Sequence, residues 1–346
     1  MLETRAYALA GVLVVALAAS GCGATTPPRQ APRVVHRASQ VASAPRAVTS
    51  VVVVSIDALN PAAIRRLGRR GTPTLHRLVR RGASTMNART ERERTETLPN
   101  HTGMVTGRRI VADRGGHGVI WNDDRRHPAT VQEAAGHGVS SVFDIVHGAG
   151  GPTAVFAGKS KFSLFDRSWG DSIDRSTLIE RDRRLTRAVR RDLARRTRAF
   201  RFVHLAAVDH AGHRHGFMSA RYLDAVRATD RRLGRIVAAI ESGPDAGSTV
   251  LVVTADHGGK GVDHFDPTRL ANYRVPFIVW GTGVRRGADL YALNPDYRDP
   301  GRRRTSYATR RQPVRNGDVA NLVTDLLGLE PVGGSQLDAQ QDLDVR

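Results

Sequence analysis

Acidic and imidazole side chains follow three runs of apolar and β-branched residues in this chain. The runs span residues 51–56, 200–208 and 249–254, and the polar residues after them are Asp57, Asp209, His213, Asp256, His257 and His264. Carboxylate oxygens and imidazole nitrogens together suit zinc and similar divalent metals. One tetrahedral ion needs three or four ligands, so these six donors are enough to begin two metal sites. Any one of them could instead cap a helix or be structural, but their recurrence after three such runs indicates a site.

Thr97 is the candidate nucleophile, because it lies just before a helix predicted to have Pro99 in its first turn and Gly107 at its end. Backbone N–H groups and the positive end of the helix dipole favour binding of a phosphoryl group there. Coordination to a metal would lower the pKa of the hydroxyl enough for it to attack. Two alternatives stay open: Thr97 caps the helix, or Thr95 or Thr102 is the nucleophile.

The predicted elements alternate between strands and helices. Strands are expected at residues 51–56, 141–146, 153–157, 200–208, 249–254 and 275–280, and helices at 61–67, 74–81, 99–107, 177–198, 220–240 and 319–327. Such alternation predicts an α/β fold, with a mostly parallel central sheet between two helical layers in a three-layer sandwich. Ligands of open α/β sheets bind outside the carboxyl ends of the strands, where the polar residues are found.

The N-terminal residues predict export. An apolar run at residues 8–19 leads into Ala19-Ser20-Gly21-Cys22, and this segment is too short to span a membrane. We interpret 1–22 as a lipoprotein-type signal peptide, with Cys22 lipidated as the first mature residue; an ordinary cleaved signal is the alternative. We therefore expect a cell-envelope lipoprotein, attached through Cys22 to the outer face of the membrane.

The remaining chain divides by composition. Residues 23–48 are rich in Ala, Pro, Thr, Arg and Gln and predict a disordered tether, 49–335 form one globular domain, and 336–346 are expected to be a polar tail. With a single cysteine, the chain cannot form an internal disulfide.

The net charge of +20 comes almost entirely from arginine, because Lys159, Lys161 and Lys260 are the only lysines. A basic surface attracts polyanions, although it can also be an ordinary solvated surface. The chain shows no basic motif interleaved with aromatic residues, so we infer no specific nucleic-acid binding.

The order of the candidate residues resembles the alkaline phosphatase superfamily, and within it the type I phosphodiesterase/nucleotide pyrophosphatase branch. The resemblance rests on Asp57, Thr97-Leu98-Pro99-Asn100-His101, Asp209-x-x-x-His213, Asp256-His257-Gly258 and His264. The segment from His117 to Asn122 is similar to the His-Gly-Ile-Val-Gly-Asn element of that branch. The resemblance runs from about residue 50 to residue 330 and implies an alkaline phosphatase-like domain.

The resemblance also implies roles for these residues. One zinc would be held by Asp57, Thr97, Asp256 and His257, and the other by Asp209, His213 and His264. Thr97 would attack phosphorus and form a phosphothreonine, while Asn122 and the backbone N–H of residue 98 would stabilise the charged oxygen. The expected cofactors are thus two divalent metal ions, most simply Zn²⁺. The expected substrate is a phosphorylated small molecule, either a nucleotide or a phosphodiester.

Two alternatives remain at this stage. The same site could cleave phosphomonoesters or phosphonates, or the chain could be a non-catalytic basic lipoprotein that binds anionic polymers of the envelope. A sulfatase is excluded, because no Cys or Ser stands at the nucleophile position. Lys159, Lys161, Phe162 and Trp169 could line a substrate pocket or belong to the surface.

Overall fold

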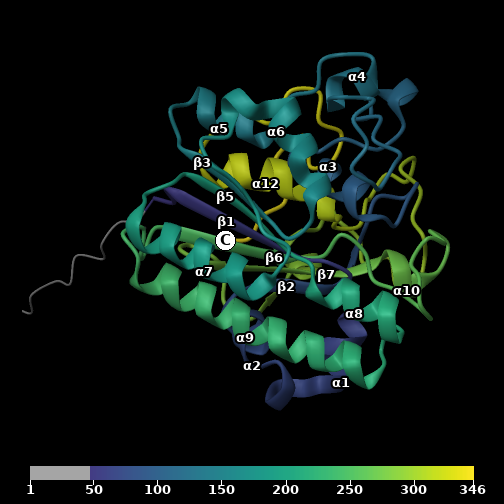
Figure 1. The fold of residues 1–346 in the computed structure, drawn as a ribbon, viewed down its shortest axis with the longest axis vertical. Helices are drawn as coiled ribbons and strands as arrows, with labels where there is room; N and C mark the ends of the chain where they lie inside the picture. The colour runs from purple at the N-terminus through teal and green to yellow at the C-terminus, as the bar shows by residue number, and fades with distance from the viewer. Residues whose placement is uncertain (1–46) are drawn as a thin grey trace, which may run out of the picture. The chain divides into compact units, whose positions relative to one another are not determined.

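An eight-stranded sheet forms the centre of the computed structural model, which describes residues 47–346 (Figure 1). The predicted signal peptide, Cys22 and nearly all of the predicted tether lie outside the described residues. The strand order is β4-β3-β5-β1-β6-β7-β2-β8, and every strand except β7 runs in the same direction. The strands are β1 (Ser50–Ile56), β2 (Ala83–Arg89), β3 (Thr153–Ala157), β4 (Ser176–Leu178), β5 (Phe200–Leu205), β6 (Thr249–Thr254), β7 (Arg274–Gly281) and β8 (Ala288–Asp289).

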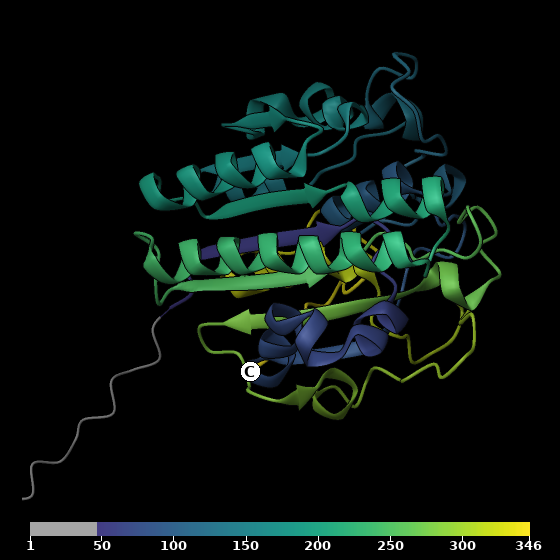
Figure 2. The same cartoon turned by 60° about the horizontal axis from the view of Figure 1, so that its bottom comes forward.

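Helices cover both faces of this sheet, which confirms the predicted layering (Figures 1 and 2). One layer contains α1 (Pro61–Gly71), α2 (Pro73–Arg81), α7 (Asp182–Arg195), α8 (Ala207–His215) and α9 (Ala220–Ser242). The other contains α3 (Thr97–Thr106), α4 (Val131–Ala135), α5 (Val142–Gly148), α6 (Ser163–Trp169) and α12 (Val319–Leu326). The short helices α10 (Leu270–Tyr273) and α11 (Leu290–Leu293) adjoin β7 and β8.

The central strands are apolar because helices shield them on both sides. Val51, Val52, Val53 and Val54 of β1 have no exposed surface, and β5 and β6 flank β1 in parallel register. Continuous apolar runs of this kind are typical of strands buried on both faces. Within residues 47–346, no helix has both the length and the hydropathy required to cross a membrane.

The strand predicted at residues 141–146 is wrong, since this segment forms helix α5. The Ser141 side chain accepts a hydrogen bond from the backbone N–H of Asp144, and the Asp144 carboxylate accepts one from the backbone N–H of Ser141. This reciprocal capping box starts a helix. The prediction of a strand relied on a short apolar run. The capping residues Ser141 and Asp144 were the stronger signal, and they indicate a helix.

Other boundaries also differ from the predictions. The run at 200–208 ends as a strand at Leu205, and α8 begins at Ala207, so Asp209 and His213 lie on a helix. In place of the helix predicted at 177–198, the structure has strand β4, which ends at Leu178, and helix α7, which spans only Asp182–Arg195. Strands β2, β4 and β8 were not predicted, and β7 pairs antiparallel with its neighbours. Short strands and strand direction depend on partners that are distant in sequence.

The C-terminal segment, predicted as a polar tail, packs against the domain instead. Leu337, Leu343 and Val345 are each at most 5% exposed. The carbonyl oxygen of Val345 accepts a hydrogen bond from the backbone N–H of Arg285 at 2.8 Å. Burial of three apolar side chains outweighs the polar character of the residues between them.

Candidate active site

Four adjacent strands bring their carboxyl ends together at one edge of the sheet, in the order β3, β5, β1 and β6. Lys159 follows β3, Asp209 follows β5 on helix α8, Asp57 follows β1, and Asp256 follows β6. These residues are separated by up to 199 positions in sequence, yet the parallel arrangement delivers them to one place. This is the edge at which α/β sheets bind ligands.

Asp57, Asp256 and His257 form what we call the inner cluster. All three side chains are fully buried. The Nε2 atom of His257 lies 3.4 Å from Oδ1 of Asp57 and 3.2 Å from Oδ2 of Asp256. The backbone N–H groups of Ala58 and His257 each donate to Oδ1 of Asp256 at 3.0 Å. Ala58 has a φ of 60°, which is unusual for a residue other than glycine.

Asp209, His213 and His264 form the outer cluster. The Nε2 atom of His213 lies 3.3 Å from Oδ1 of Asp209 and 3.0 Å from Nε2 of His264, and His264 Nε2 lies 3.8 Å from the same Asp209 oxygen. Asp209 and His213 are one helical turn apart on α8. The side chain of His213 is 38% exposed, so this cluster opens to solvent. The two clusters adjoin, because donor atoms of Asp57, Asp209 and His257 all lie within 4.8 Å of one another.

Four donor atoms, three in the inner cluster and one in the outer cluster, have no hydrogen-bond partner in the described part of the chain and are available to bind a metal. Within residues 47–346, buried atoms without any hydrogen-bond partner include Asp57 Oδ1, Asp209 Oδ1, Asp256 Oδ2 and His257 Nε2. The Nδ1 atoms of the three cluster histidines each lie against a backbone carbonyl oxygen, those of Gly258, Thr95 and Val262. A carbonyl can only accept, so each Nδ1 carries the proton and each Nε2 presents its lone pair to the cluster.

The distances also fit tetrahedral coordination. Two ligands of such an ion, each bound at about 2.0–2.1 Å, are separated by about 3.3 Å. The separations in the inner cluster are 3.2 and 3.4 Å, and those in the outer cluster are 3.0, 3.3 and 3.8 Å. Buried donors without partners, at these distances and in these tautomers, are what a pair of divalent metals requires.

Thr97 is the first residue of α3 and is fully buried beside the clusters. The N-cap of the helix is Glu96, so the Thr97 hydroxyl does not cap it. Instead, Thr97 Oγ1 accepts a hydrogen bond from Lys159 Nζ at 3.2 Å. The other two candidate hydroxyls donate to backbone carbonyls, Thr95 to His264 and Thr102 to Leu98. Of the three threonines, Thr97 has its hydroxyl directed into the site.

Lys159 joins the two clusters. Its Nζ atom lies 2.6 Å from Oδ2 of Asp57 and 2.7 Å from Oδ2 of Asp209. Burial disfavours the ammonium, but the two carboxylates outweigh this effect and raise the pKa of Lys159. Burial likewise disfavours the Asp57 carboxylate, yet Lys159 and His204 hold the pKa of Asp57 well below its ordinary value. At Asp256, burial and the negative charge of Asp57 outweigh the opposing effects of Lys159 and the Ala58 N–H, and the pKa of Asp256 is raised.

The sequence did not identify His204, which holds Asp57 in place. The backbone N–H of Gly158 donates to Nδ1 of His204 at 3.2 Å, so Nε2 carries the proton and donates to Oδ2 of Asp57 at 2.9 Å. Its place on β5, level with Ser55 of β1, was the available signal. His101, which was given no ligand role, contacts the Thr97 carbonyl through Nδ1 at 2.7 Å.

Asn122, predicted to act together with the backbone N–H of residue 98, lies next to the start of α3. Its Oδ1 accepts hydrogen bonds from the backbone N–H of Leu98 at 2.9 Å and from Lys161 Nζ at 3.1 Å. Lys159 and Lys161 thus both lie at the site, whereas Phe162 and Trp169 are core residues with at most 4% exposure. Two of the three lysines in the chain lie at this site. Their rarity and their closeness in the sequence were the available signal.

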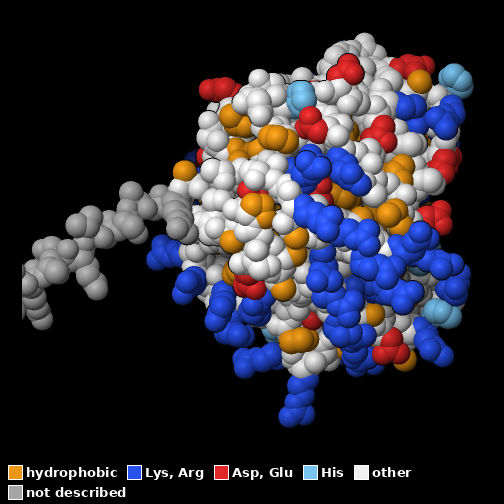
Figure 3. All heavy atoms as spheres, turned by 60° about the vertical axis from the view of Figure 1, so that its left-hand side comes forward, with side chains coloured by type: hydrophobic (Ala, Val, Ile, Leu, Met, Phe, Trp, Pro, Cys, Tyr) orange, Lys and Arg blue, Asp and Glu red, His pale blue; other side chains and the backbone are white. Residues whose placement is uncertain are grey.

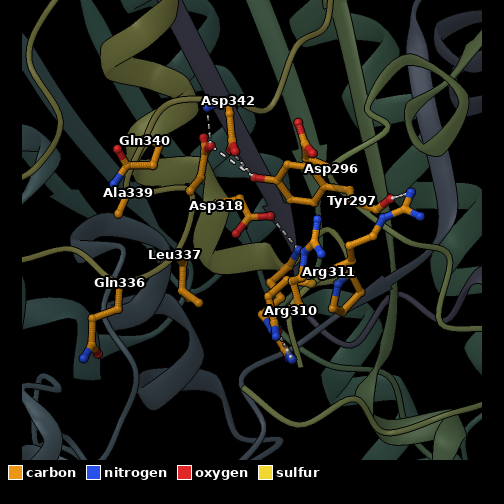
Figure 4. Close-up of a pocket in the computed structure, with 14 residues that line it drawn as sticks. Asp296, Tyr297, Arg310, Arg311, Asp318, Gln336, Leu337, Ala339, Gln340 and Asp342 are labelled. Carbon is orange, nitrogen blue, oxygen red and sulfur yellow. Dashed lines mark hydrogen bonds between the residues drawn. The ribbon is translucent and has the colours of Figure 1, made fainter. Parts of the chain in front are cut away.

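A pocket of about 380 Å³ lies elsewhere in the structure, and none of the candidate active-site residues lines it (Figure 4). The hydroxyl of Tyr297 lies 3.1 Å from Oδ1 of both Asp338 and Asp342. Burial and the nearby charge of Asp318 raise the pKa of Asp338 to about 9. This pocket is lined by residues between Asp296 and Asp342 and carries no histidine, so it is separate from the inner and outer clusters.

Comparisons with solved structures show the same fold in phosphoester- and sulfate-related enzymes. The murine ectonucleotide pyrophosphatase / phosphodiesterase 5, in an inactive form bound to AMP, superposes with a TM-score of 0.62 at 14% identity and covers 86% of this chain and 100% of that chain. A protein of the alkaline phosphatase superfamily from Vibrio parahaemolyticus superposes with a TM-score of 0.56 at 12% identity, over 86% of this chain and 71% of the other. At these identities the likeness concerns the fold alone.

Curated relatives match over shorter segments. GPI ethanolamine phosphate transferase 1 of Candida glabrata is 29% identical over 147 residues, which is 42% of this chain and 15% of that protein. The enzyme of the same name from Gibberella zeae is 33% identical over 139 residues, or 38% of this chain and 14% of the relative. The matches therefore span about one seventh of the length of these relatives.

A family model matches most of the chain. The model for type I phosphodiesterase / nucleotide pyrophosphatase aligns with residues 51–321, which include both clusters, Thr97 and Asn122. The match covers more than three quarters of the chain and every strand of the sheet except the first residue of β1. The chain is a phosphoester hydrolase-like enzyme that belongs to the type I phosphodiesterase / nucleotide pyrophosphatase family.

Proposed function

We propose that this enzyme hydrolyses phosphodiester or nucleotide pyrophosphate bonds with two divalent metal ions and with Thr97 as nucleophile. The observation that carries the proposal is the pair of adjoining clusters beside Thr97 Oγ1. Four of their donor atoms are buried and have no hydrogen-bond partner among the described residues, namely Asp57 Oδ1, Asp209 Oδ1, Asp256 Oδ2 and His257 Nε2. Uncompensated buried carboxylates are costly unless a cation joins them. Lys159 supplies one positive charge to three carboxylates, which leaves the site negatively charged.

The residues divide between two metal positions. Asp57, Asp256, His257 and Thr97 would hold one ion, and Asp209, His213 and His264 would hold the other. When bound, a metal pair stabilises the attacking and leaving oxygens of an in-line displacement at phosphorus. The nitrogen and carboxylate donors favour zinc, and manganese is the competing assignment.

The chain's own residues carry out the remaining steps. The Thr97 hydroxyl loses its proton to solvent and its oxygen bonds to phosphorus. The bond from phosphorus to the leaving oxygen breaks with the electron pair staying on that oxygen, which takes up a proton from solvent. The Lys159 ammonium, 3.2 Å from Thr97 Oγ1, stabilises the negative charge that develops there. Water then cleaves the phosphothreonine and restores the hydroxyl. The Leu98 N–H, which donates to Asn122 Oδ1 at 2.9 Å, would exchange this partner for a phosphoryl oxygen when substrate binds, and the Asn122 amide N–H group would donate to the same oxygen.

The relatives support two substrate classes. The murine structure contains AMP, which supports a nucleotide substrate. The curated relatives are named as transferases of ethanolamine phosphate, a phosphate ester of an alcohol, and this name supports a phosphoester substrate. Hydrolysis of either substrate class breaks one bond between phosphorus and a leaving oxygen, so the same residues of the site serve both.

The test combines metal content with turnover. We expect the purified protein to contain about two zinc ions per chain and to hydrolyse bis-(p-nitrophenyl) phosphate faster than p-nitrophenyl phosphate, with both activities lost on chelation. Thr97→Ala should abolish turnover, because the nucleophile is removed, while most of the metal is retained.

Thr102→Ala is the matched control. It deletes the same kind of hydroxyl five residues further along α3, where Thr102 contacts the Leu98 carbonyl instead of Lys159. Turnover by Thr97→Ala at the level of this control would remove Thr97 from its role. A folded, metal-free and inactive wild-type protein would refute the enzyme proposed here, and a preference for the monoester would replace the substrate class.

A further inference from the structure

A cleft of about 780 Å³ lies next to the candidate active site but contains none of its metal-binding residues. Gly259 and Lys260, which follow the inner cluster in sequence, form part of its wall. Phe217 forms another part, and its ring lies 5.7 Å from that of His213 and 6.2 Å from that of His264. The cleft is therefore a separate space that shares Phe217 with the outer cluster.

The charges around this cleft are all positive. Its lining includes five cationic side chains and no carboxylate, the cations being Arg65, Lys260, Arg269, Arg274 and Arg302. Among residues 47–346, Arg269 has an ion-pair partner, Asp266 at 3.0 Å, and the other four have no carboxylate within salt-bridge distance. A concave surface lined by one sign of charge focuses the electric field and concentrates ions of the opposite sign.

Arg274 is the clearest example of how unfavourable this concentration of positive charge is. The side chain is partly buried, and its Nε atom is buried without a hydrogen-bond partner among the described residues. Burial, together with repulsion from Arg65 and Arg302, lowers the pKa of Arg274. A guanidinium that has lost water and gained like-charged neighbours is unfavourable by itself, and a bound anion would offset both effects.

We propose that this cleft is an anion-binding site for phosphate-type groups, distinct from the catalytic centre. Guanidinium groups bind phosphate through paired N–H donors, and the Lys260 ammonium adds a compact charge. The volume accommodates more than one phosphate, so the expected ligand is a polyphosphate or a phosphate-bearing chain.

The remainder of the basic surface differs in shape. The helical layer that contains α7 and α9 is coated with arginine side chains, which gather over the lower half of Figure 3. Arg187, Arg190 and Arg191 of α7 are exposed on a convex helix. Divergent charges of this kind attract polyanions weakly and without a defined site. The cleft differs from the convex surface because its positive side chains converge on one space.

The probe for the test is the dye 8-hydroxypyrene-1,3,6-trisulfonate, followed by fluorescence anisotropy and displaced with inorganic tripolyphosphate. Its sulfonates are permanently charged and bind zinc poorly, so they report on arginine-rich sites more than on the metal centre. We expect one dye per chain. We expect Arg274→Gln/Arg302→Gln to weaken dye binding at least about tenfold, because two charge-assisted contacts are lost.

The matched control is Arg187→Gln/Arg191→Gln, which removes the same charge from the convex face of α7 and should change binding less than about twofold. If the cleft variant fails to fold, Arg65→Gln/Lys260→Gln tests the same site with two exposed side chains that have no partner among the described residues. Equal losses in cleft and control variants would overturn the proposal in favour of diffuse attraction. Undiminished binding by both cleft variants would also overturn it.

A second measurement identifies the source of the phosphate group. Cosedimentation with phosphatidylglycerol vesicles that depends on the cleft arginines would assign a lipid headgroup. Displacement of the dye by tripolyphosphate, without such vesicle binding, would assign a soluble polyphosphate chain. Dye binding does not require turnover, so failure of the proposed hydrolysis and failure of the anion site are distinguishable.

Discussion

The inner and outer clusters use the same residue types but differ in burial and in what holds them. The inner cluster is fully buried, and two backbone N–H groups fix Asp256. The outer cluster includes His213, which is 38% exposed and lies on a helix near solvent. Burial and backbone contacts hold donor atoms in place before a metal binds, whereas an exposed ligand can move and exchange. We therefore expect a firmly held ion at the inner cluster and an exchangeable ion at the outer cluster.

The largest expected effect is that of Asp57→Asn. This change removes an inner ligand and leaves Lys159 and His204 without their shared carboxylate. Loss of several kcal/mol of transition-state stabilisation corresponds to a rate reduction of at least about a thousandfold. The measurements are kcat with a diester substrate and zinc content by atomic emission.

His213→Ala is the counterpart in the outer cluster. We expect one of the two metals to be lost, with a smaller activity loss of about 10–100-fold that excess zinc partly restores. Equal and irreversible losses in the two variants would contradict the proposed difference between the clusters.

Lys159→Met tests whether the lysine competes with metal for the carboxylates it joins. Without the ammonium, the metal-free protein should be less stable, since like charges are no longer compensated. Metal binding should become about tenfold tighter, because no bound cation has to yield its carboxylates. Chelator competition gives the affinity, and thermal unfolding of the metal-free protein gives the stability. Weaker metal binding by Lys159→Met would show that the lysine assists coordination.

The smallest expected effect is a difference between the two clusters in how acidification weakens metal binding. The Asp209 carboxylate, whose Oδ1 lies 3.3 Å from His213 Nε2, raises the pKa of His213 above 6.5, whereas burial lowers that of His257 below 6.5 and that of His264 to about 3. Protons compete with metal for an imidazole, so acidification through the raised pKa of His213 disfavours metal at the outer cluster first. Between pH 7.5 and about pH 6, we expect one metal to become several-fold easier to extract with a chelator. Simultaneous release of both ions would contradict this order.

The candidate site was predictable from the sequence to the extent that it follows the strand ends. Asp57 and Asp256 come directly after apolar runs, and a parallel sheet must place such residues at one edge. Thr97 was identified from its position before a helix, and the structure places its hydroxyl beside Lys159. The prediction failed at residues 141–146, where a short apolar run could not distinguish a strand from a capped helix.

Local sequence determined the order of the motifs, the main parallel strands and the residue types available for metal binding, because each depends on a few neighbouring residues. Only the tertiary structure decided that Lys159 joins Asp57 to Asp209 and that His204 supports Asp57. It also decided that Arg65, Arg274 and Arg302 converge on one cleft. These relations join segments that are far apart in the chain, and their strength depends on burial, which removes the water that would otherwise screen each charge. Sequence spacing carries no information about that loss of water.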